Sequence, residues 1–365
     1  MADMHRDRGA GLTTSRASDA TGRKSDTTGK KGASGRRRVT ITDVGTAAGV
    51  STSTVSRVLN GTARVDPDLA ARVQGAVAEL GYRPNAAARG LARGETDAVG
   101  VLVPDLSNPY FPDLLKAVSA VARSHGRRVM VMESDEDPAS EHELAEDLMR
   151  CCDGVLLCSP RMERAALVDL PLRDHPVVLV NRIVPGLSVP SVSVDFYGGM
   201  TLACGHLTQL GHRRVAYLSG PEASWANAER IRAFDAAAAF GLDVTVIPCG
   251  HTAKHGYAAA DGVQAAGVTA VVAYNDLVAL GALTALEESG LRVPEDMSVI
   301  GCDDISLDDL PSSRRLTTAS LARHELGRQA TEMLEALMAD GGDSEPRYIP
   351  MELLVRGTSA PPARG

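Results

Sequence analysis

The stretch VTITDVGTAAGVSTSTVSRVLN, residues 39–60, decides the fold of the amino-terminal part of the chain. Thr40 and Asp43 have the spacing of a capping box, which starts a helix. Apolar residues follow at helical spacing on its inner face: Ile41, Val44 and Ala48. Gly49 then supplies the tolerance of positive φ that a tight turn needs. The pattern predicts a short helix, a turn and a second helix, the arrangement that places a helix in the DNA major groove.

The second predicted helix has an apolar inner face and a small, hydroxylic and cationic outer face. Val50 would fill the gap between the helices, and Ser51 can cap the second one. Small side chains let the backbone approach the groove, hydroxyls bond phosphates or base edges, and Arg57 can grip a guanine with two bonds. We predict DNA contacts from Thr40, Ser51, Thr52, Ser53, Thr54, Ser56, Arg57 and Asn60. The alternative is an ordinary surface helix rich in Ser and Thr.

A third helix follows in the same amino-terminal region. Asp66 is a capping residue and Pro67 suits the first helical position, so a helix should open there. It should run to about Leu80 and stop at Gly81. Its predicted buried stripe is Leu69, Val73, Val77 and Leu80.

Several motifs, taken together and in order, resemble the LacI/GalR (lactose-repressor) family of bacterial transcription regulators. The segments DVGTAAGVSTSTVSRVLNG (43–61) and RVDPDLAARVQGAVAELGYRPNAAARGLARG (64–94) resemble that family's DNA-binding headpiece and hinge. The segments that resemble its effector-binding core are VGVLVPDLSNPYF (99–111), LGHRRVAYLSGP (210–221), VVAYNDLVALGAL (271–283) and VPEDMSVIGCDD (293–304). The resemblance therefore covers nearly everything after Arg38.

The resemblance implies a role for the alanine-rich segment 85–96. In the family, this hinge folds when two subunits meet on the operator, and a leucine pair wedges into the minor groove and kinks the DNA. Leu91 matches the wedge, Ala88 the close helix contact and Asn85 the start of the hinge. The alternative is a plain alanine-rich linker with one exposed leucine.

Charge is unevenly distributed along the chain. The formal net charge is −8, which taken globally argues against nucleic-acid binding. However, residues 1–38 carry ten Lys/Arg and four Asp, net +6, and residues 39–94 carry six Arg and four acidic residues, net +2. The remainder therefore carries −16, so the asymmetry suits a DNA-contacting front end on an acidic sensor body.

Targeting signals and cysteines narrow the class further. No apolar run is long enough to span a bilayer and the start MADMHRDRGAGL lacks an apolar signal core, so we expect a cytoplasmic, nucleoid-associated protein without a membrane partner. The six cysteines (151, 152, 158, 204, 249 and 302) show no Cys-x-x-Cys spacing and lie mostly in apolar strand-like runs. We interpret them as reduced core residues, with a redox-active Cys151–Cys152 pair as the alternative, and expect no metal and no cofactor.

The segment after residue 96 alternates β-branched runs with helical stretches. The strand-like runs are AVGVLVP, RRVMVME, DGVLLCS, PVVLVN, SVSVD, RRVAYLSG, DVTVIPC, AVVAYN and SVIGCDD. The predicted helices are 112–124, 139–150, 227–240, 255–266 and 276–288. The predicted fold class is thus a small all-α helix-turn-helix headpiece plus an α/β periplasmic-binding-protein-like core of two doubly wound parallel-sheet lobes. A ligand is expected at the carboxyl ends of the strands, in the cleft between the lobes.

We divide the chain into five parts. Residues 1–38, poor in apolar residues, should be a disordered basic tail in which the run Arg36–Arg38 could add phosphate contacts. The alternatives are a solvated tail or a start codon chosen too far upstream. Residues 39–84 form the DNA-binding domain, 85–96 the hinge, 97–358 the effector-binding and dimerisation core, and 359–365 a disordered tail.

Polar and aromatic residues at the predicted strand ends are candidate effector contacts. They are Asn108, Tyr110, Phe111, Asn181, Arg182, Trp225, Arg230, Asn275, Asp276 and Asp303, together with His251. The resemblance implies that Phe111, Arg230 and Asp276 line the pocket and that His251 stands where the family often has an aromatic residue. Aromatic faces beside charged and amide groups suit a polyhydroxylated ring, so a sugar is the leading effector class, with a nucleoside or purine next. For Asn275, Asp276 and Asp303, capping of the following helix is a credible alternative.

The sequence shows no catalytic constellation, since its histidines are scattered and no nucleophile-elbow or phosphate-loop pattern occurs. We therefore expect a homodimeric regulator, not an enzyme, that binds a pseudo-palindromic operator in double-stranded DNA, with a repressor as the leading form. Its affinity would be modulated by a small molecule between the lobes. The alternative is a solute- or sugar-binding protein without a gene-regulatory role.

Overall fold

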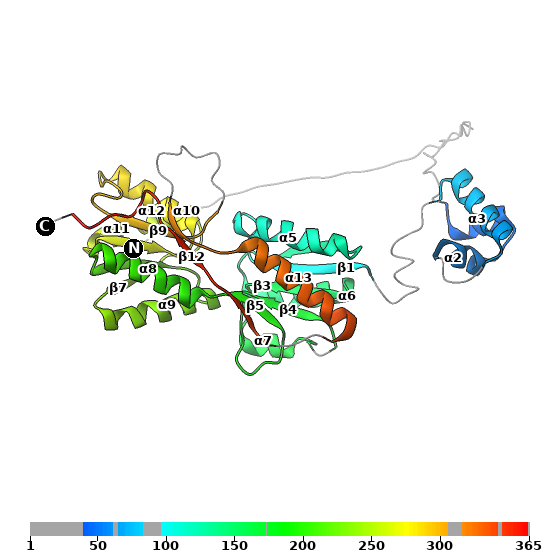
Figure 1. Ribbon diagram of the computed structural model, residues 1–365, viewed down its shortest axis with the longest axis horizontal. Helices are drawn as coiled ribbons and strands as arrows, with labels where there is room; N and C mark the ends of the chain where they lie inside the picture. The colour runs from blue at the N-terminus through cyan, green and yellow to red at the C-terminus, as the bar shows by residue number, and fades with distance from the viewer. Residues whose placement is uncertain are drawn as a thin grey trace, which may run out of the picture. The chain divides into compact units, whose positions relative to one another are not determined.

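The structure, a computed structural model, describes residues 39–60, 65–82, 96–172, 174–305, 316–341 and 345–363. The chain divides between Pro84 and Asn85 into two compact units, a small helical one and a larger α/β one (Figure 1). The predicted tail 1–38 and the predicted hinge contacts Asn85, Ala88 and Leu91 lie outside the described residues, as does the side chain of Asn60.

The described residues of the small unit form three helices: α1 (Ile41–Ala48), α2 (Thr52–Asn60) and α3 (Pro67–Leu80). The predicted capping box is confirmed, because the Thr40 backbone N–H donates to Asp43 Oδ2 at 2.8 Å and the Asp43 N–H donates to Thr40 Oγ1 at 3.4 Å. Gly49 adopts a left-handed φ of 66° in the turn. As predicted, Asp66 caps the start of α3 and Gly81 caps its end. The fully buried residues of this unit are Val44, Val55 and Val73.

Two contacts fix the angle between α1 and its neighbours. Gly45 allows the close approach of the turn, since a Cβ there would lie 2.9 Å from the carbonyl oxygen of Val50. From α3, the Arg72 guanidinium donates to the carbonyl oxygen of Ala48 at 2.5 Å and so satisfies the end of α1. Arg72 is thus a structural residue of this unit.

The first lobe of the larger unit is a six-stranded parallel sheet in the order β11-β5-β4-β3-β1-β2. Its strands are β1 (Ala98–Val103), β2 (Arg128–Glu133), β3 (Gly154–Cys158), β4 (Val177–Val180), β5 (Ser191–Val194) and β11 (Arg347–Ile349). Its helices are α5 (Tyr110–Ser124), α6 (Pro138–Cys151), α7 (Arg164–Asp169) and α13 (Arg323–Asp340). Alternate residues of the buried strands face two separate apolar cores, as a doubly wound sheet requires.

The second lobe has the strand order β12-β10-β9-β8-β6-β7, parallel except for antiparallel β12. Its strands are β6 (Arg214–Ser219), β7 (Asp243–Pro248), β8 (Ala270–Ala273), β9 (Ser298–Asp303), β10 (Thr317–Ser320) and β12 (Glu352–Leu354). Its helices are α8 (Phe196–Leu210), α9 (Trp225–Ala237), η1 (Ala238–Phe240), α10 (Ala253–Ala258), α11 (Ala260–Ala265) and α12 (Asp276–Glu288). The predicted fold class is confirmed for both units.

The chain passes between the lobes at three places within the described residues: from β5 into α8, from β10 into α13, and from β11 to β12. In the last crossing, β11 of the first sheet precedes Pro350 and Met351, and β12 of the second sheet follows them. The crossings are joined where the Asp195 backbone N–H donates to the carbonyl oxygen of Ile349 at 2.8 Å. Such a three-stranded connection is a hinge on which two lobes can close.

Some details of the prediction were wrong. The helix expected over 255–266 is two helices, α10 and α11, and strands β10–β12 and helices α7, α8 and α13 were not predicted. The predicted tail 359–365 begins too early, because the backbone of Ala360 bonds Ser298 and His212 in the second lobe. Thr96, assigned to the hinge, belongs to the core through two hydrogen bonds to Asp153.

The cysteines were only partly placed by the prediction. Cys158 and Cys302 lie in strands, whereas Cys204 lies in α8 and Cys151 ends α6 with an exposed side chain. All six thiols are free. In the part of the chain that the structure describes, no helix is long and apolar enough to cross a bilayer.

Candidate functional site

The outer face of α2 is the candidate DNA interface. Thr52, Ser53 and Arg57 are exposed, Thr54 and Ser56 are half-buried, and Val55 is fully buried on the opposite side. Arg57 has neither a hydrogen bond nor an ion pair with any described residue, so its guanidinium faces solvent with its full set of donors. The helix therefore presents the hydroxylic and cationic surface that its spacing predicted.

Two hydroxyls of this face have structural partners. Ser51 Oγ accepts from the Thr54 backbone N–H at 3.2 Å, which is the predicted cap of α2. It also lies 2.8 Å from Ser53 Oγ and 2.9 Å from Thr54 Oγ1. Thr40 donates its hydroxyl to Asp43. These contacts order the start of each helix, so Thr40 and Ser51 support the face as well as belonging to it.

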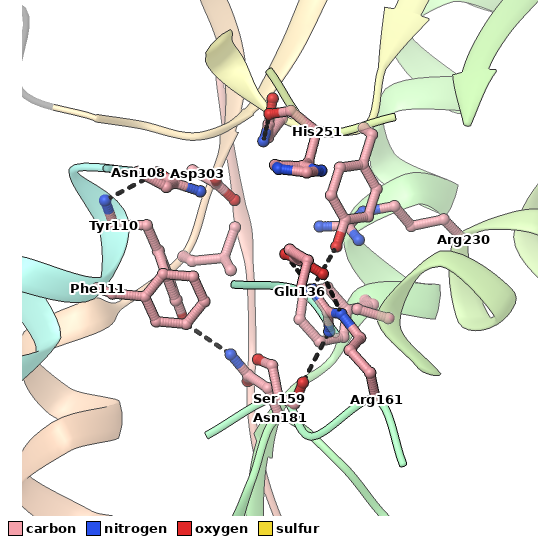
Figure 2. A pocket seen from close by; sticks show the side chains of 15 residues that line it. Asn108, Tyr110, Phe111, Glu136, Ser159, Arg161, Asn181, Arg230, His251 and Asp303 are labelled. Carbon is pink, nitrogen blue, oxygen red and sulfur yellow. Dashed lines mark hydrogen bonds and ion pairs between the residues drawn. The ribbon is translucent and has the colours of Figure 1, made fainter. Parts of the chain in front are cut away.

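The candidate effector site is a cavity at the carboxyl ends of strands from both lobes (Figure 2). Eight of the predicted effector contacts line it: seven from strand ends and His251, which the family resemblance suggested. The seven are Asn108, Tyr110, Phe111, Asn181, Arg230, Asn275 and Asp303. The other lining residues are Glu136, Ser159, Arg161, Phe196, Ala226, Tyr274 and Leu321. The lining thus combines aromatic faces with amide, carboxylate and guanidinium groups.

Several residues of the lining have a left-handed backbone. The φ angles of Glu136, Ser159, Asn181 and Asp303 are 58°, 48°, 55° and 112°. Each of these residues follows or ends a different strand, and none is a glycine. Such conformations cost of order 1–3 kcal/mol each and persist where the surroundings impose them, typically at binding sites. These backbone conformations set the directions in which the four side chains leave the main chain at the cavity wall.

Arg230, on α9, is a buried cation with unused donors. Its guanidinium lies between two aromatic rings, 4.5 Å from the Phe196 centroid and 4.8 Å from the Tyr274 centroid. Nη2 lies 3.2 Å from Cys302 Sγ, while Nε and Nη1 are buried without a hydrogen-bond partner among the described residues. Buried polar groups are normally satisfied, so these two nitrogens keep hydrogen-bonding capacity that the described residues do not use.

Asp303 ends β9 opposite Asn108. Burial raises the pKa of Asp303 to about 7, although the guanidiniums of Arg230 and Arg323 and a hydrogen bond from Asn108 favour its ionised form. Arg323 also donates to the carbonyl oxygens of Asp303 and Asp304, which fixes this strand end. The carboxyl of Asp303 can therefore present either a donor or acceptors to a ligand near neutral pH.

The lobes touch each other across the cavity. His251 Nε2, from the second lobe, lies 3.9 Å from Asp105 Oδ2 of the first lobe. Arg161 Nη2, from the first lobe, lies 3.5 Å from the hydroxyl of Tyr274 in the second. The cavity between the lobes has a volume of about 30 Å³, far below the roughly 300–1,000 Å³ of a typical ligand pocket. A larger ligand can enter only when the lobes separate.

Three predicted contacts do not line the cavity, and each has a structural role instead. Arg182 donates to the carbonyl oxygens of Pro160 and Met162. Trp225 packs edge-on against Phe196, with ring centroids 6.1 Å apart. Asp276 accepts from Thr318 Oγ1 at 2.7 Å and from the Ile305 backbone N–H at 2.9 Å, so it ties α12 to the strand region beside it. Their positions near strand ends were predicted, but not their directions.

The same strand-end rule could have found several of the missed residues. Glu136 follows β2, Ser159 and Arg161 follow β3, and Tyr274 follows β8 directly. Phe196, an aromatic residue that follows β5, could have been found in the same way. Ala226 and Leu321 are neither polar nor aromatic, so the sequence offered no signal for them. Among the described residues, no group of three or more His, Cys, Asp and Glu side chains could hold a metal ion.

Comparison with known proteins gives the same division of the chain. A family model described as "Bacterial regulatory proteins, lacI family" matches residues 40–85. A second, described as "Periplasmic binding proteins and sugar binding domain of LacI family", matches residues 96–356. The two matches correspond to the small helical unit and the larger α/β unit.

Individual proteins match over almost the whole chain. The HTH-type transcriptional regulator GalS of Salmonella typhimurium is 36% identical over 333 residues, which cover 87% of this chain and 95% of that protein. The structure of a lac repressor dimer bound to operator and the anti-inducer ONPF has a TM-score of 0.79 at 26% identity, covering 89% of this chain and 100% of that one. A complex of the transcriptional regulator CelR with cellobiose has a TM-score of 0.65 at 29% identity, covering 88% and 100%.

Proposed function

The chain belongs to the LacI family of bacterial regulatory proteins, a family of DNA-binding transcription regulators and not of enzymes, and from that premise we propose its specific role. It is a repressor that acts in the cytoplasm and binds a pseudo-palindromic operator as a homodimer. A small sugar between the lobes modulates its affinity for DNA. The family matches confirm the predicted resemblance. The repressor role, the homodimer and the sugar ligand are proposals.

The observation that carries the ligand-binding part is the pair of unused donors on Arg230. A buried N–H group without a partner costs about 1–3 kcal/mol, and more when the group is charged. A hydroxyl or ring oxygen of a ligand would satisfy Nε and Nη1 where no described residue does. The cavity is therefore more stable when it is occupied by a molecule rich in acceptors.

The rest of the lining supports a sugar. Phe111, Phe196 and Tyr274 offer apolar faces for the carbon skeleton, while Asn108, Asn181 and Asn275 offer amides for hydroxyl groups. The CelR structure contains cellobiose, a sugar, at the level of similarity given above. A nucleoside or purine is the second ligand class, because the same rings could stack on a base.

The coupling of ligand to DNA follows from the closed state of the cavity. A ligand of sugar size does not fit in about 30 Å³, so binding changes the separation of the lobes. In a dimer, such a change alters the arrangement of the subunits and hence the spacing of the two DNA-binding units. Each ligand must bind the two arrangements unequally for this to work.

Exposed sheet edges support a dimer. Strand β2 forms one edge of the first sheet, and its residues Met130 and Val131 are 39% and 38% exposed. Strand β7 forms an edge of the second sheet, where Val246 is 41% exposed. Apolar edge strands are commonly covered by a partner chain. The lac repressor structure is itself a dimer on its operator.

The test is enrichment of genomic DNA fragments on the purified full-length protein, repeated with a panel of sugars and nucleosides. We expect a palindromic site whose enrichment is lost or gained with one sugar. A response to nucleosides alone would reassign the ligand class. Absence of enrichment under every condition would contradict the regulatory role and favour a ligand-binding protein without one.

A further inference from the structure

Arg161 is the second arginine of the cavity, and unlike Arg230 it is paired. Its Nε lies 2.6 Å from Glu136 Oε2 and its Nη2 lies 2.9 Å from Glu136 Oε1, which is a two-bond fork. Nη1 donates to the carbonyl oxygen of Ser159 at 2.8 Å. The side chains of Arg161 and Glu136 are 4% and 11% exposed. The guanidinium charge is therefore cancelled within the cavity wall.

The surrounding backbone holds this pair in place. Glu141 Oε2 accepts from the backbone N–H groups of Arg161 and Met162, at 2.7 and 2.6 Å, and so fixes the loop after β3. Glu136 and Ser159, which contact the guanidinium, both have the left-handed backbone described above. A pair supported in this way has a set geometry before any ligand arrives.

Tyr274 connects the pair to Arg230. Its hydroxyl lies 3.5 Å from Arg161 Nη2, and its ring lies over the Arg230 guanidinium. The two arginines are thus separated by a single tyrosine side chain. A ligand that bonds to Arg230 therefore lies close enough to be affected by any uncompensated charge at Arg161 or Glu136.

The charged side chains of the lining are balanced. Two are guanidiniums, Arg161 and Arg230, and two are carboxyls, Glu136 and Asp303. One carboxyl and one guanidinium are paired in the Glu136–Arg161 fork. The other two, Arg230 and Asp303, attract each other within the cavity. With both carboxyls ionised, the cavity has no surplus positive charge for an anionic ligand.

We propose that the Glu136–Arg161 pair sets the charge selectivity of the effector site. By cancelling the Arg161 guanidinium, Glu136 makes the cavity select an uncharged ligand and reject the acidic or phosphorylated derivatives of the same compound. The inference rests on the proposed function of the cavity as an effector site. It makes Glu136 a specificity-determining residue that acts by removing an anion site.

The test compares Glu136→Gln with the wild type by calorimetric titration of the full-length protein at pH 8. The probes are inorganic phosphate and two matched sets: glucose, glucuronate and glucose 6-phosphate, and galactose, galacturonate and galactose 6-phosphate. We expect the substitution to free Arg161 and to strengthen phosphate binding by at least about 30-fold, a typical worth of one buried charge pair. In the wild type, an anionic member of a set should bind at least about tenfold more weakly than its neutral sugar.

Two further variants control this result. Glu332→Gln removes the same charge from an exposed pair with Arg328 on α13 and should leave phosphate binding at the wild-type level. The double variant Glu136→Gln with Arg161→Gln restores the balance of charge and should again reject phosphate. A gain of phosphate binding in the double variant would show that a loosened cavity, not a freed cation, is responsible, and would overturn the proposal.

The remaining outcomes separate the two levels of inference. If no sugar binds but phosphate binding rises only in Glu136→Gln, the charge selectivity stands and the sugar assignment fails. Equal binding of anions to the wild type and to Glu136→Gln overturns the charge selectivity and leaves the sugar assignment intact. If Glu136→Gln does not fold, the wild-type titrations decide, because a wild type that binds phosphate or an acidic sugar as tightly as a neutral sugar contradicts the proposal.

Discussion

The recognition face of α2 and the effector cavity differ in how they hold their functional groups. On α2, Arg57 is exposed and the hydroxyl side chains are exposed or half-buried, and no polar residue is buried among the described residues of the small unit. In the cavity, Arg230, Asn181 and Asp303 are all less than a tenth exposed. Function on α2 therefore costs the fold almost nothing, whereas the cavity keeps polar groups in an environment that penalises them.

This difference predicts opposite consequences of mutation. An exposed residue of the recognition face that caps no helix, such as Arg57, can be removed with loss of binding and no loss of stability. A charged residue of the cavity opposes folding until a ligand satisfies it, so its removal can stabilise the protein while abolishing its response. The following experiments test that contrast.

The largest effect is expected from Arg230→Met. The substitution removes two unsatisfied donors and keeps an apolar side chain between the rings of Phe196 and Tyr274. Effector binding should weaken by about 100-fold or more, whereas the melting temperature without ligand should stay the same or rise. Calorimetric titration and thermal unfolding measure the two. A marked fall in melting temperature with unchanged affinity would reverse the roles of the two regions.

Arg57→Ala should act only on DNA. Because the side chain is exposed and makes no hydrogen bond or ion pair with a described residue, the melting temperature should not change. Operator affinity should fall by about 1–3 kcal/mol, and one base preference should relax. Binding to a library of operator variants measures both. Wild-type affinity and selectivity would remove Arg57 from the recognition face.

The buried carboxyls should make the larger unit sensitive to pH. Burial raises the pKa of Asp276 to about 8, helped by the charge of Asp303, whose own pKa is raised to about 7. Their ordinary pKa is 3.8, so between these values the folded protein binds protons that the unfolded chain does not. Proton binding by these two carboxyls therefore stabilises the folded state. This contribution is complete below about pH 4 and is lost as the pH rises through 7 and 8.

This pH dependence can be isolated with Asp276→Asn. In the wild type, the free energy of unfolding should fall by on the order of 1 kcal/mol per pH unit for each carboxyl between pH 5 and 7. The variant, which also loses an acceptor for the Ile305 N–H, should show a smaller slope at a lower overall stability. Denaturant titrations at several pH values give the slope. Identical slopes would mean that Asp276 is ionised throughout.

The smallest effect is expected from Thr40→Ala. The substitution removes the hydroxyl cap of α1 but leaves the Thr40 backbone bond to Asp43. The small unit should lose about 1 kcal/mol of stability, and effector binding should not change. Amide hydrogen exchange of residues 41–48 measures the first effect. A change in effector affinity would contradict the separation of the two sites.

The sequence predicted the two regions unequally, for a physical reason. On α2, a helical period fixes which side chains face inward, so Val55 and Arg57 could be assigned without knowing the rest of the fold. In the cavity, strand ends could be located, but the direction of each side chain depends on contacts with distant residues. Trp225 and Asp276 lie near strand ends but do not line the cavity: Trp225 packs against the lining residue Phe196, and Asp276 bonds Thr318.

The elements missed in the fold share a related cause. The strands β10–β12 span only three or four residues each, and their pairings join parts of the chain far apart in sequence. Arg161 follows β3 and could have been found at a strand end, but its pairing with Glu136, which follows β2, could not. Local patterns predict local structure well, and they do not encode which strand ends meet.

The crossing of β11 and β12 between the sheets has a consequence for synthesis of the protein on the ribosome. Neither sheet can be completed before residues 347–354 are synthesised, because this segment supplies an edge strand to each sheet. The small unit needs only residues 39–82 and precedes that segment by more than two hundred positions. At about 5–20 residues per second, the DNA-binding unit can fold many seconds before either sheet is complete. The recognition face of α2 can therefore be formed well before the sheets that carry the effector cavity are complete.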